Sequence, residues 1–315
     1  MSTQSVVGVD VAKDSFDAAI VASSKAKRYS NDEEGISGFI EALRVLSEPF
    51  VVMEATGPYQ RTLTRMLAAN AISYSVVNPR AIRHFAKADN ILAKTDGVDA
   101  KVIATYGERM APRPTTPPTQ RATELNALVA RRRNLIEAVA AEKKRKHTAE
   151  PIIEEGIVEH IVFLQRSIEK LRRQIDQLLN SCSTLSARAT LLDTVPGVGP
   201  VLISTLIAQL PELGQLPHKQ LAALVGVAPY NCDSGQYHGD RKCWGGRVHV
   251  RSALYMATVA SLRCNPVTSH LYHHLKARGK PSKVAIVACM HKLLRILNAM
   301  ARDSKPWEPH MTVSA

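Results

Sequence analysis

The order of apolar and polar positions predicts an α/β region at the start of the chain. SVVGVD (5–10) is a short β-branched run ending in a carboxylate, and residues 16–22 have the composition of its hairpin partner. The elements expected next are a helix, a buried strand, a helix and a strand, over residues 33–46, 50–53, 58–69 and 73–77. Strands and helices alternate, which is typical of the α/β class.

The middle of the chain has the spacing of a coiled coil. Apolar residues recur at alternating intervals of four and three, namely Ile157, Ile161, Leu164, Ile168, Leu171, Ile175 and Leu178. Partner positions on the preceding helix are Leu125, Leu128, Leu135 and Val139. The pattern fits both an antiparallel hairpin within one chain and pairing between chains.

Three regions are therefore predicted. Residues 79–110 look helical, and APRPTTPPTQ (111–120) interrupts them with four prolines. We expect a ribonuclease-H-like α/β domain over 1–110, a proline-rich linker and coiled coil over 111–184, and a mostly helical domain over 185–315.

Charge is divided unevenly between these regions. The chain holds 41 Lys and Arg against 28 Asp and Glu, and residues 1–110 are balanced at 13 of each. The whole excess of +13 therefore lies in residues 111–315. A neutral domain with acidic clusters and a basic extension suits an enzyme that acts on nucleic acid, although a basic surface also serves plain solubility.

Cysteine usage and the amino terminus indicate a cytoplasmic protein. The five cysteines are scattered without a CxxC pair, as expected of reduced thiols. The start MSTQSVVGVDVAKD has no signal-peptide pattern, and we expect no membrane partner.

Four carboxylates have positions that favour metal binding. Asp10 ends the first strand, Glu54 follows the buried strand 50–53, and Asp96 and Asp99 share one face of a predicted helix. Strand ends in an α/β sheet converge on one rim, so these oxygens would hold two Mg²⁺ or Mn²⁺ ions for phosphodiester chemistry. Lys94 would contact phosphate. Taken singly, each acid also fits a turn or helix-cap residue.

A strand-end aspartate also occurs in the actin-like sugar kinases and ATPases. Those enzymes need glycine-rich phosphate loops after the first strand and later in the chain. The sequence holds no such loop, which argues against a nucleotide-dependent kinase.

The last third carries two candidate contacts with nucleic acid. PGVGP (196–200) joins two apolar helices like a helix-hairpin-helix element, in which Gly197 and Gly199 let backbone amides approach a phosphate. Further on, Ser234 lies in a glycine-flanked loop as a candidate nucleophile. Four cations that would stabilise phosphate charge follow it: Arg241, Lys242, Arg247 and Arg251.

Two groups of histidine and cysteine residues are candidate zinc sites. One combines Cys232, His238, Cys243 and His249, and the other comprises His270, His273 and His274. Neither has the paired-ligand spacing of a zinc site, so surface or phosphate-contact roles are favoured.

The motifs DxAK, EATGPY, NPxxxxxFAK, KTDxxDA, PGVGP and SGxxxG…GG…VRxALYMA occur in this order between residues 7 and 305. In this the chain resembles the DEDD-type transposases of the insertion sequence 110 family, the bridge-RNA-guided serine recombinases. The resemblance implies a RuvC-like domain whose metal-binding tetrad is Asp10, Glu54, Asp96 and Asp99. It also implies that Ser234 is the catalytic serine, although Cys232, Asp233 and Trp244 match no fixed family position.

The resemblance further implies a mechanism and partners. The serine attacks a DNA strand to form a covalent phosphoserine link, in a composite site completed by the carboxylate domain of another subunit. A structured noncoding bridge-type RNA pairs with donor and target double-stranded DNA, and dimers meet as a tetramer during synapsis. Such a protein would be associated with the nucleoid.

Two other functions remain compatible with the residues alone. A structure-specific, Holliday-junction-type endonuclease would use water as the nucleophile and Ser234 only as a loop residue. A non-catalytic binding module would use the basic half to hold RNA or DNA, and would be indifferent to loss of Asp10 or Asp99.

Overall fold

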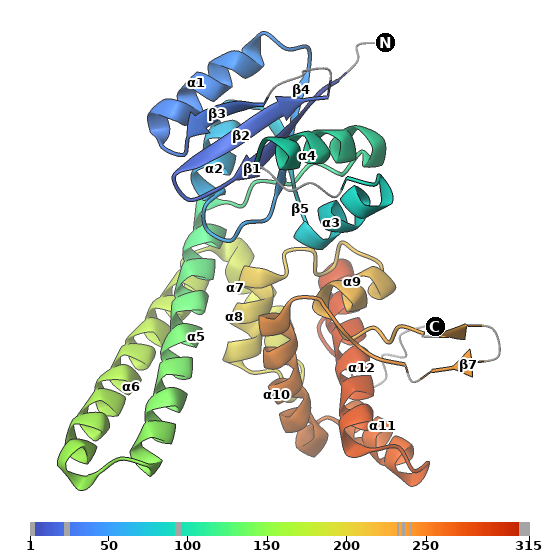
Figure 1. Ribbon diagram of the computed structural model, residues 1–315. Helices are drawn as coiled ribbons and strands as arrows, with labels where there is room; N and C mark the ends of the chain where they lie inside the picture. Colours follow the sequence, from blue (N-terminus) through green and yellow to red (C-terminus); the bar gives the residue numbers. More distant parts are fainter. Residues whose placement is uncertain are drawn as a thin grey trace. The chain divides into compact units, whose positions relative to one another are not determined.

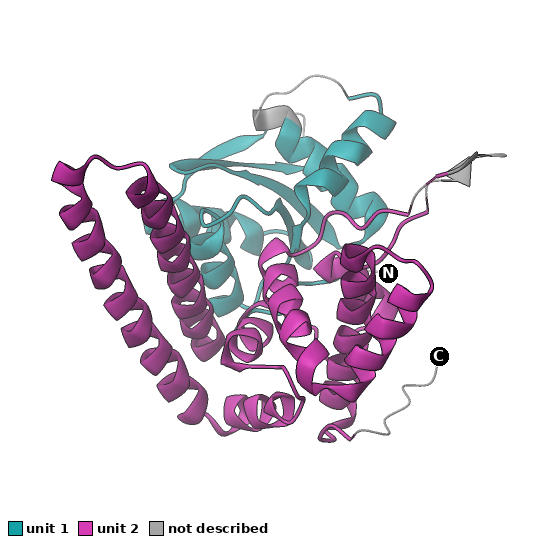
Figure 2. Cartoon of the chain, turned by 90° about the horizontal axis from the view of Figure 1, so that it is seen from below, with its two compact units in different colours: residues 1–118 teal, residues 119–315 magenta. Residues whose placement is uncertain are grey.

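A computed structural model describes residues 4–21, 26–91, 96–231, 233–234, 237–239 and 241–308. The chain divides into two compact units, residues 1–118 and 119–315 (Figure 2). The division lies inside the predicted proline-rich linker, and the helices of the predicted coiled coil group with the helices that follow them. The finer division into three regions stays a prediction.

The first unit is built on a five-stranded mixed sheet. Its strands are β1 (Ser5–Val11), β2 (Ser15–Ile20), β3 (Lys27–Ser30), β4 (Pro49–Glu54) and β5 (Ser73–Val77). Their order is β3-β2-β1-β4-β5, with β1, β2 and β3 antiparallel and β1, β4 and β5 parallel (Figure 1). The predicted α/β class is confirmed for this half of the chain.

Helices pack against the sheet in two separate apolar clusters. The helices of this unit are α1 (Glu33–Arg44), α2 (Arg61–Ala69), α3 (Pro79–Ala88) and α4 (Asp96–Met110). Val7, Val9 and Met53 pack with α1 and α2, whereas Val52 and Phe50 pack with α3 and α4. Because alternate strand residues point to opposite faces, the clusters belong to opposite sides of the sheet.

β3 was not among the elements expected from the sequence. Its four residues, KRYS, are mostly exposed and carry no apolar alternation. Across the strands Arg28 Nη2 lies 2.8 Å from Asp17 Oδ2. The strand is held by backbone pairing, by this ion pair and by the Tyr29 ring, which packs on Phe16 and Phe39. A single aromatic residue makes no alternating hydrophobic pattern in the sequence.

The linker is partly bound to the sheet. The Thr115 amide donates to the Tyr74 carbonyl at 2.7 Å, and the Val76 amide donates to Thr115 Oγ1 at 2.9 Å. Prolines on either side of Thr115 keep this segment extended. It therefore lies along the outer edge of β5.

The second unit begins with two long helices that form a hairpin within the chain. These are α5 (Gln120–His147) and α6 (Pro151–Asn180), which run side by side (Figure 1). Leu135 and Val139 on α5 pack with Ile161 and Leu164 on α6. This antiparallel arrangement is one of the two alternatives that the seam allowed.

Six helices and a short hairpin make up the rest of the described chain. They are α7 (Ser183–Asp193), α8 (Pro200–Gln209), α9 (His218–Val225), β6 (Asp233–Ser234), β7 (Tyr237–His238), α10 (Val248–Cys264), α11 (Pro266–Ala277) and α12 (Ser282–Asp303). Their core includes α12, which by length and composition alone could cross a membrane. Half of its apolar stretch is buried inside the unit, as in a core helix.

Candidate functional site

Asp10 and Glu54 lie at equivalent ends of neighbouring strands. The parallel register pairs Val9 on β1 with Met53 on β4, so Asp10 and Glu54 are the next residues on each strand. Both are half-buried. Residues in register on parallel strands share a face, and two-residue alternation places this pair on the face that α4 covers.

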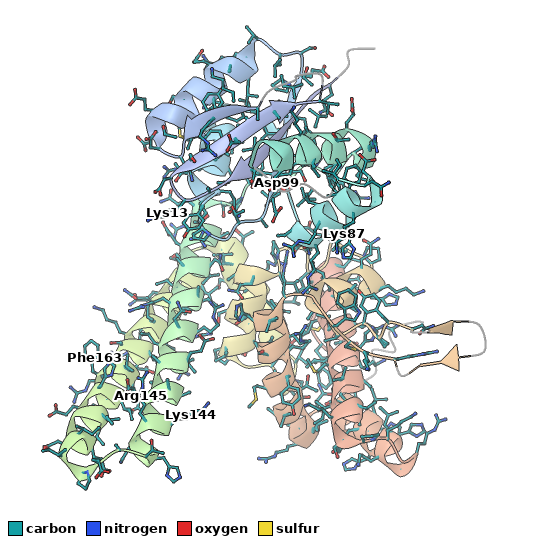
Figure 3. All side chains as sticks on the ribbon, in the orientation of Figure 1. Lys13, Lys87, Asp99, Lys144, Arg145 and Phe163 are labelled. Atoms are coloured by element: carbon teal, nitrogen blue, oxygen red, sulfur yellow. The ribbon has the colours of Figure 1, made fainter. Side chains whose placement is uncertain are left out.

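Helix α4 brings Asp99 to the same end of the sheet. A Cβ added to Gly8 would lie 2.2 Å from the Ala100 carbonyl oxygen and the Ala104 amide nitrogen, so the helix touches β1 there. Further along, a Cβ on Gly107 would lie 2.7 Å from Val6. The helix therefore runs antiparallel to β1, and its first turn with Asp99 lies toward the Asp10 end (Figure 3).

The predicted tetrad is described at three of its four side chains. Asp96 is the first residue of α4, but its side chain lies outside the described residues, as does the whole of Lys94. Among the side chains that the structure describes, no three Asp, Glu, His or Cys groups gather closely enough to hold a metal ion. The donor set consists of carboxylate oxygens on one face, which is the chemistry that Mg²⁺ or Mn²⁺ requires.

Ser234 lies on a projecting two-stranded arm. β6 pairs with β7 in antiparallel register, Ser234 opposite Tyr237. At the base of the arm the Tyr230 amide donates to the Lys242 carbonyl at 3.1 Å, and the reverse bond measures 3.3 Å. The Ser234 side chain lies outside the described residues, so its role as nucleophile stays a prediction.

Two of the four predicted phosphate-binding cations are engaged within the chain. Both terminal nitrogens of Arg247 donate to Glu212 at 2.6 Å, and Nη1 also donates to the Gln209 carbonyl at 2.8 Å. Burial alone would raise the pKa of Glu212, but these bonds from Arg247 outweigh it and the pKa is lowered. Arg247 therefore ties the start of α10 to the segment after α8.

Arg251 holds the glycine loop at the base of the arm. Its Nη1 donates to the Gly245 carbonyl and, at 3.4 Å, to the Val225 carbonyl. Gly246 adopts φ +71°, and a Cβ there would meet Gly226. Arg241 and Lys242 are exposed on the arm itself. Phosphate contact by the four cations stays a prediction, and these contacts give Arg247 and Arg251 a positioning role.

The two glycines of the PGVGP turn differ in environment. Gly197 has φ +88°, and a Cβ there would lie 2.4 Å from Cα of Ser261 on α10. Its lack of a side chain is therefore needed for packing between helices. Gly199 is the N-cap of α8, and nothing lies within 4 Å of the position its Cβ would take. Of the two, Gly199 is the one that leaves space for a ligand.

The proposed histidine and cysteine groups do not form a metal site within the described part of the chain. The rings of His270 and His274 stack with centroids 6.4 Å apart. Cys232 and the His238 side chain lie outside the described residues. The structure thus adds no support for zinc.

Sequence reasoning missed the residues that position the candidate groups. Glu212 was not singled out, because one acid after a helix has no distinctive spacing. Gly8 lies in the first strand motif, and a glycine inside a β-branched run is a recognisable signal of close backbone approach.

Comparison with known proteins covers both units. A family model described as "Transposase", of the DEDD type of IS110, matches residues 7–149, and the model "Transposase IS116/IS110/IS902 family" matches residues 189–273. The chain is 29% identical to the pilin gene-inverting protein of Moraxella bovis over 97% of its own length and 98% of that protein. It is 25% identical to an uncharacterized 43.6 kDa protein of insertion element IS110 from Streptomyces coelicolor, over 46% of this chain and 36% of that protein.

Proposed function

Because the chain belongs to the IS110 family of DEDD transposases, which catalyse DNA strand transfer, we propose that it is an RNA-guided recombinase with a covalent phosphoserine intermediate. The observation that carries this proposal is the placement of Asp10, Glu54 and Asp99 on one face at one end of the sheet. The strand order β3-β2-β1-β4-β5 supports a ribonuclease-H-like, RuvC-like assignment for the unit.

The carboxylate unit would hold the divalent cation that the family's nuclease domain implies. We assign Asp10, Glu54, Asp96 and Asp99 as ligands of Mg²⁺ or Mn²⁺. When bound, the metal would polarise the scissile phosphate and stabilise charge on the oxygens around it. The protein's part is to fix the carboxylates: β1 and β4 set two of them in register, and α4 carries the other two.

Ser234 would supply the attacking oxygen. Its Oγ loses a proton and forms an ester bond to the phosphorus of one DNA strand, while the bond from that phosphorus to a deoxyribose oxygen breaks. The leaving oxygen takes up one proton and becomes a hydroxyl, so the protons balance. A hydroxyl from the partner strand then attacks the same phosphorus and releases the serine. Each step replaces one phosphoester bond by another, so no external energy source is needed.

Exposed cations and backbone amides would hold the nucleic acid. Arg241 and Lys242 are exposed near the base of the arm that carries Ser234, and Arg247 and Arg251 brace that base. We assign Lys94 and the PGVGP turn, with Gly197 and Gly199, to further phosphate contacts. These groups contact the phosphate backbone and do not distinguish base sequences. Base pairing by a bridge-type noncoding RNA would therefore select donor and target DNA.

The α5–α6 hairpin is the proposed site of self-association. Phe163 on α6 is 65% exposed (Figure 3). Ile152 and Ile153 near the turn are 91% and 54% exposed. A second copy of the hairpin would cover these side chains and give the dimers that form a tetramer in synapsis. A DNA-bound enzyme of this kind would act in the cytoplasm at the nucleoid.

The proposal is tested by strand transfer in cells that hold the protein, the element's noncoding flanks and a target plasmid. Sequencing should detect new junctions with wild type. The number of junctions should fall at least about 100-fold with Asp99→Asn, because one metal ligand is removed. The matched control is Glu108→Gln, an exposed acid on the same helix. Equal junction counts for Asp99→Asn and wild type would contradict the metal assignment.

DNA inversion is a second candidate reaction. Its support is the similarity over nearly the full length to the pilin gene-inverting proteins of Moraxella bovis and Moraxella lacunata. The same junction sequencing separates the two reactions. Inversion would give reciprocal junctions at both ends of a resident segment, whereas transposition would give one element joined to new flanking DNA.

A further inference from the structure

A groove of about 490 Å³ lies in the second unit between α5, the start of α8, and α10. Apolar side chains supply most of its lining, and Val201 and Met256 there are 54% and 65% exposed. The lining also includes Arg132, Arg133 and Gly199. The groove therefore combines apolar walls with cations and a helix start.

Arg132 is a buried cation whose Nε has no hydrogen-bond partner among the described residues. It is only 6% exposed. Burial lowers the pKa of Arg132, and Asp176 only partly opposes this effect. A buried guanidinium is stable only when an anion or acceptor satisfies it, so the structure leaves Arg132 short of a ligand.

The same hairpin contains a second buried charge, Glu142, whose partners are present. Glu142 is 8% exposed, and it accepts from Arg145 at 2.6 Å and lies 3.2 Å from Nδ1 of His160. Both buried charges lie on the face of α5 that carries Leu125, Leu135 and Val139. Arg132 occupies an apolar seam position where its Nε has no acceptor in the described part of the chain and Asp176 offsets the cost of burial only in part.

The start of α8 adds donors to the same groove. Gly199 caps the helix without a side-chain hydrogen bond, Pro200 is its first residue, and the space beside Gly199 is open. The amides of the first turn of any helix lack intrahelical acceptors and favour negative charge. α8 thus presents an anion-binding end beside a buried, unsatisfied arginine.

We infer that this groove binds a phosphodiester group of a nucleic-acid backbone, with Arg132 and the α8 amino terminus as its anion contacts. Arg133 is half-buried, and its Nε lies 3.7 Å from Glu137 Oε1, so it adds positive charge at the rim. The exposed apolar side chains contact the faces of the sugars. Residues 111–315 hold 28 basic against 15 acidic residues, which favours a polyanion over a protein carboxylate.

The inference rests on the proposed function, since it adds a backbone contact to that reaction. It is tested with Arg132→Met, which keeps an unbranched apolar stem and removes the guanidinium charge. The matched control is Arg131→Met, because Arg131 is the exposed neighbour on the same helix. Binding of the full-length protein to a labelled duplex DNA and to a labelled RNA hairpin is measured by anisotropy over a salt series.

We expect Arg132→Met to weaken binding about 10-fold and to reduce the salt slope by about 0.9, the value for one lost phosphate contact. Arg131→Met should change the affinity much less. The melting temperature of Arg132→Met should stay equal to that of wild type or rise, since a buried unpaired charge is removed. Loss confined to DNA or to RNA would identify the source of the phosphodiester.

Two results would overturn the inference. One is equal affinity for Arg132→Met and Arg131→Met, and the other is a lower melting temperature with Arg132→Met, which would make Arg132 a structural partner of Asp176. Failure of the proposed function gives a different pattern: strand transfer is absent from wild type while the Arg132-dependent binding persists.

Discussion

Arg247 illustrates how one side chain can shape a site without touching the substrate. It joins α10 to Glu212 through two bonds of 2.6 Å. We expect Arg247→Lys to destabilise the protein by about 2 kcal/mol, because an ammonium cannot form both bonds in the guanidinium geometry. Urea unfolding measures this. Arg241→Lys, on the exposed arm, is the control, and equal midpoints for the two variants would refute the positioning role.

His291 makes stability depend on pH. Burial lowers the pKa of His291, and Arg295 and His218 lower it further. The unfolded chain, with a histidine pKa near 6.5, then binds the proton more readily than the folded chain. Neutral His291 therefore contributes fully to stability above about pH 6.5. This contribution is lost as the pH falls through that value toward the lower pKa of His291 in the folded chain.

The corresponding substitution is His291→Gln. Melting temperatures measured between pH 7.5 and pH 5 should fall less steeply for this variant than for wild type. Exposed His147→Gln is the control and should follow the wild-type curve. Parallel curves for His291→Gln and wild type would argue against the buried neutral histidine.

At this scale the sequence predicted positions better than contacts. Strand-end placement of Asp10 and Glu54 follows from the pattern of β-branched residues, and the register confirms their position at the same end. The engagement of Arg247 and Arg251 was not foreseeable, because their acceptors are distant in sequence. Arg132 did leave a signal, since it occupies a seam position between Leu128 and Leu135.

Among the elements, α4 and β1 determine the geometry of the carboxylates. Gly8 allows the helix backbone to touch the strand. Gly8→Ala should displace α4 and destabilise the unit by about 3 kcal/mol, because the neighbouring atoms are backbone. Strand transfer should fall with it. Gly38→Ala on α1, where nothing lies within 4 Å, is the control and should preserve or raise the melting temperature. An unchanged melting temperature for Gly8→Ala would contradict this packing.

Elements with strong periodicity were predicted well, and weak ones were not. The seam residues of α6 face α5 as expected, with Ile161, Leu164 and Ile175 buried. β3 was missed because an exposed polar edge strand has no apolar alternation. The sequence alone could not distinguish a hairpin within one chain from pairing between two chains, because both arrangements bury the same residues.

On the scale of the whole molecule, the exposed apolar side chains of the hairpin predict self-association. Phe163→Glu should weaken the oligomer at least about 10-fold, because a charge at a packed interface remains uncompensated. Sedimentation of wild type and variant over a concentration series measures the effect. Val45→Glu, at an 85% exposed position in the other unit, is the control. A concentration dependence equal to that of wild type would exclude the hairpin as the interface.

Covalent trapping is the most direct test of serine chemistry that depends on the carboxylates of the first unit. The protein is expressed with the element's noncoding flanks and a target plasmid, isolated under denaturing conditions and probed for attached DNA. We expect an adduct with wild type and with Ser183→Ala, which replaces an exposed serine of the same unit, and none with Ser234→Ala or Asp99→Ala. Nicked DNA without any adduct would contradict serine chemistry and favour an endonuclease in which water attacks.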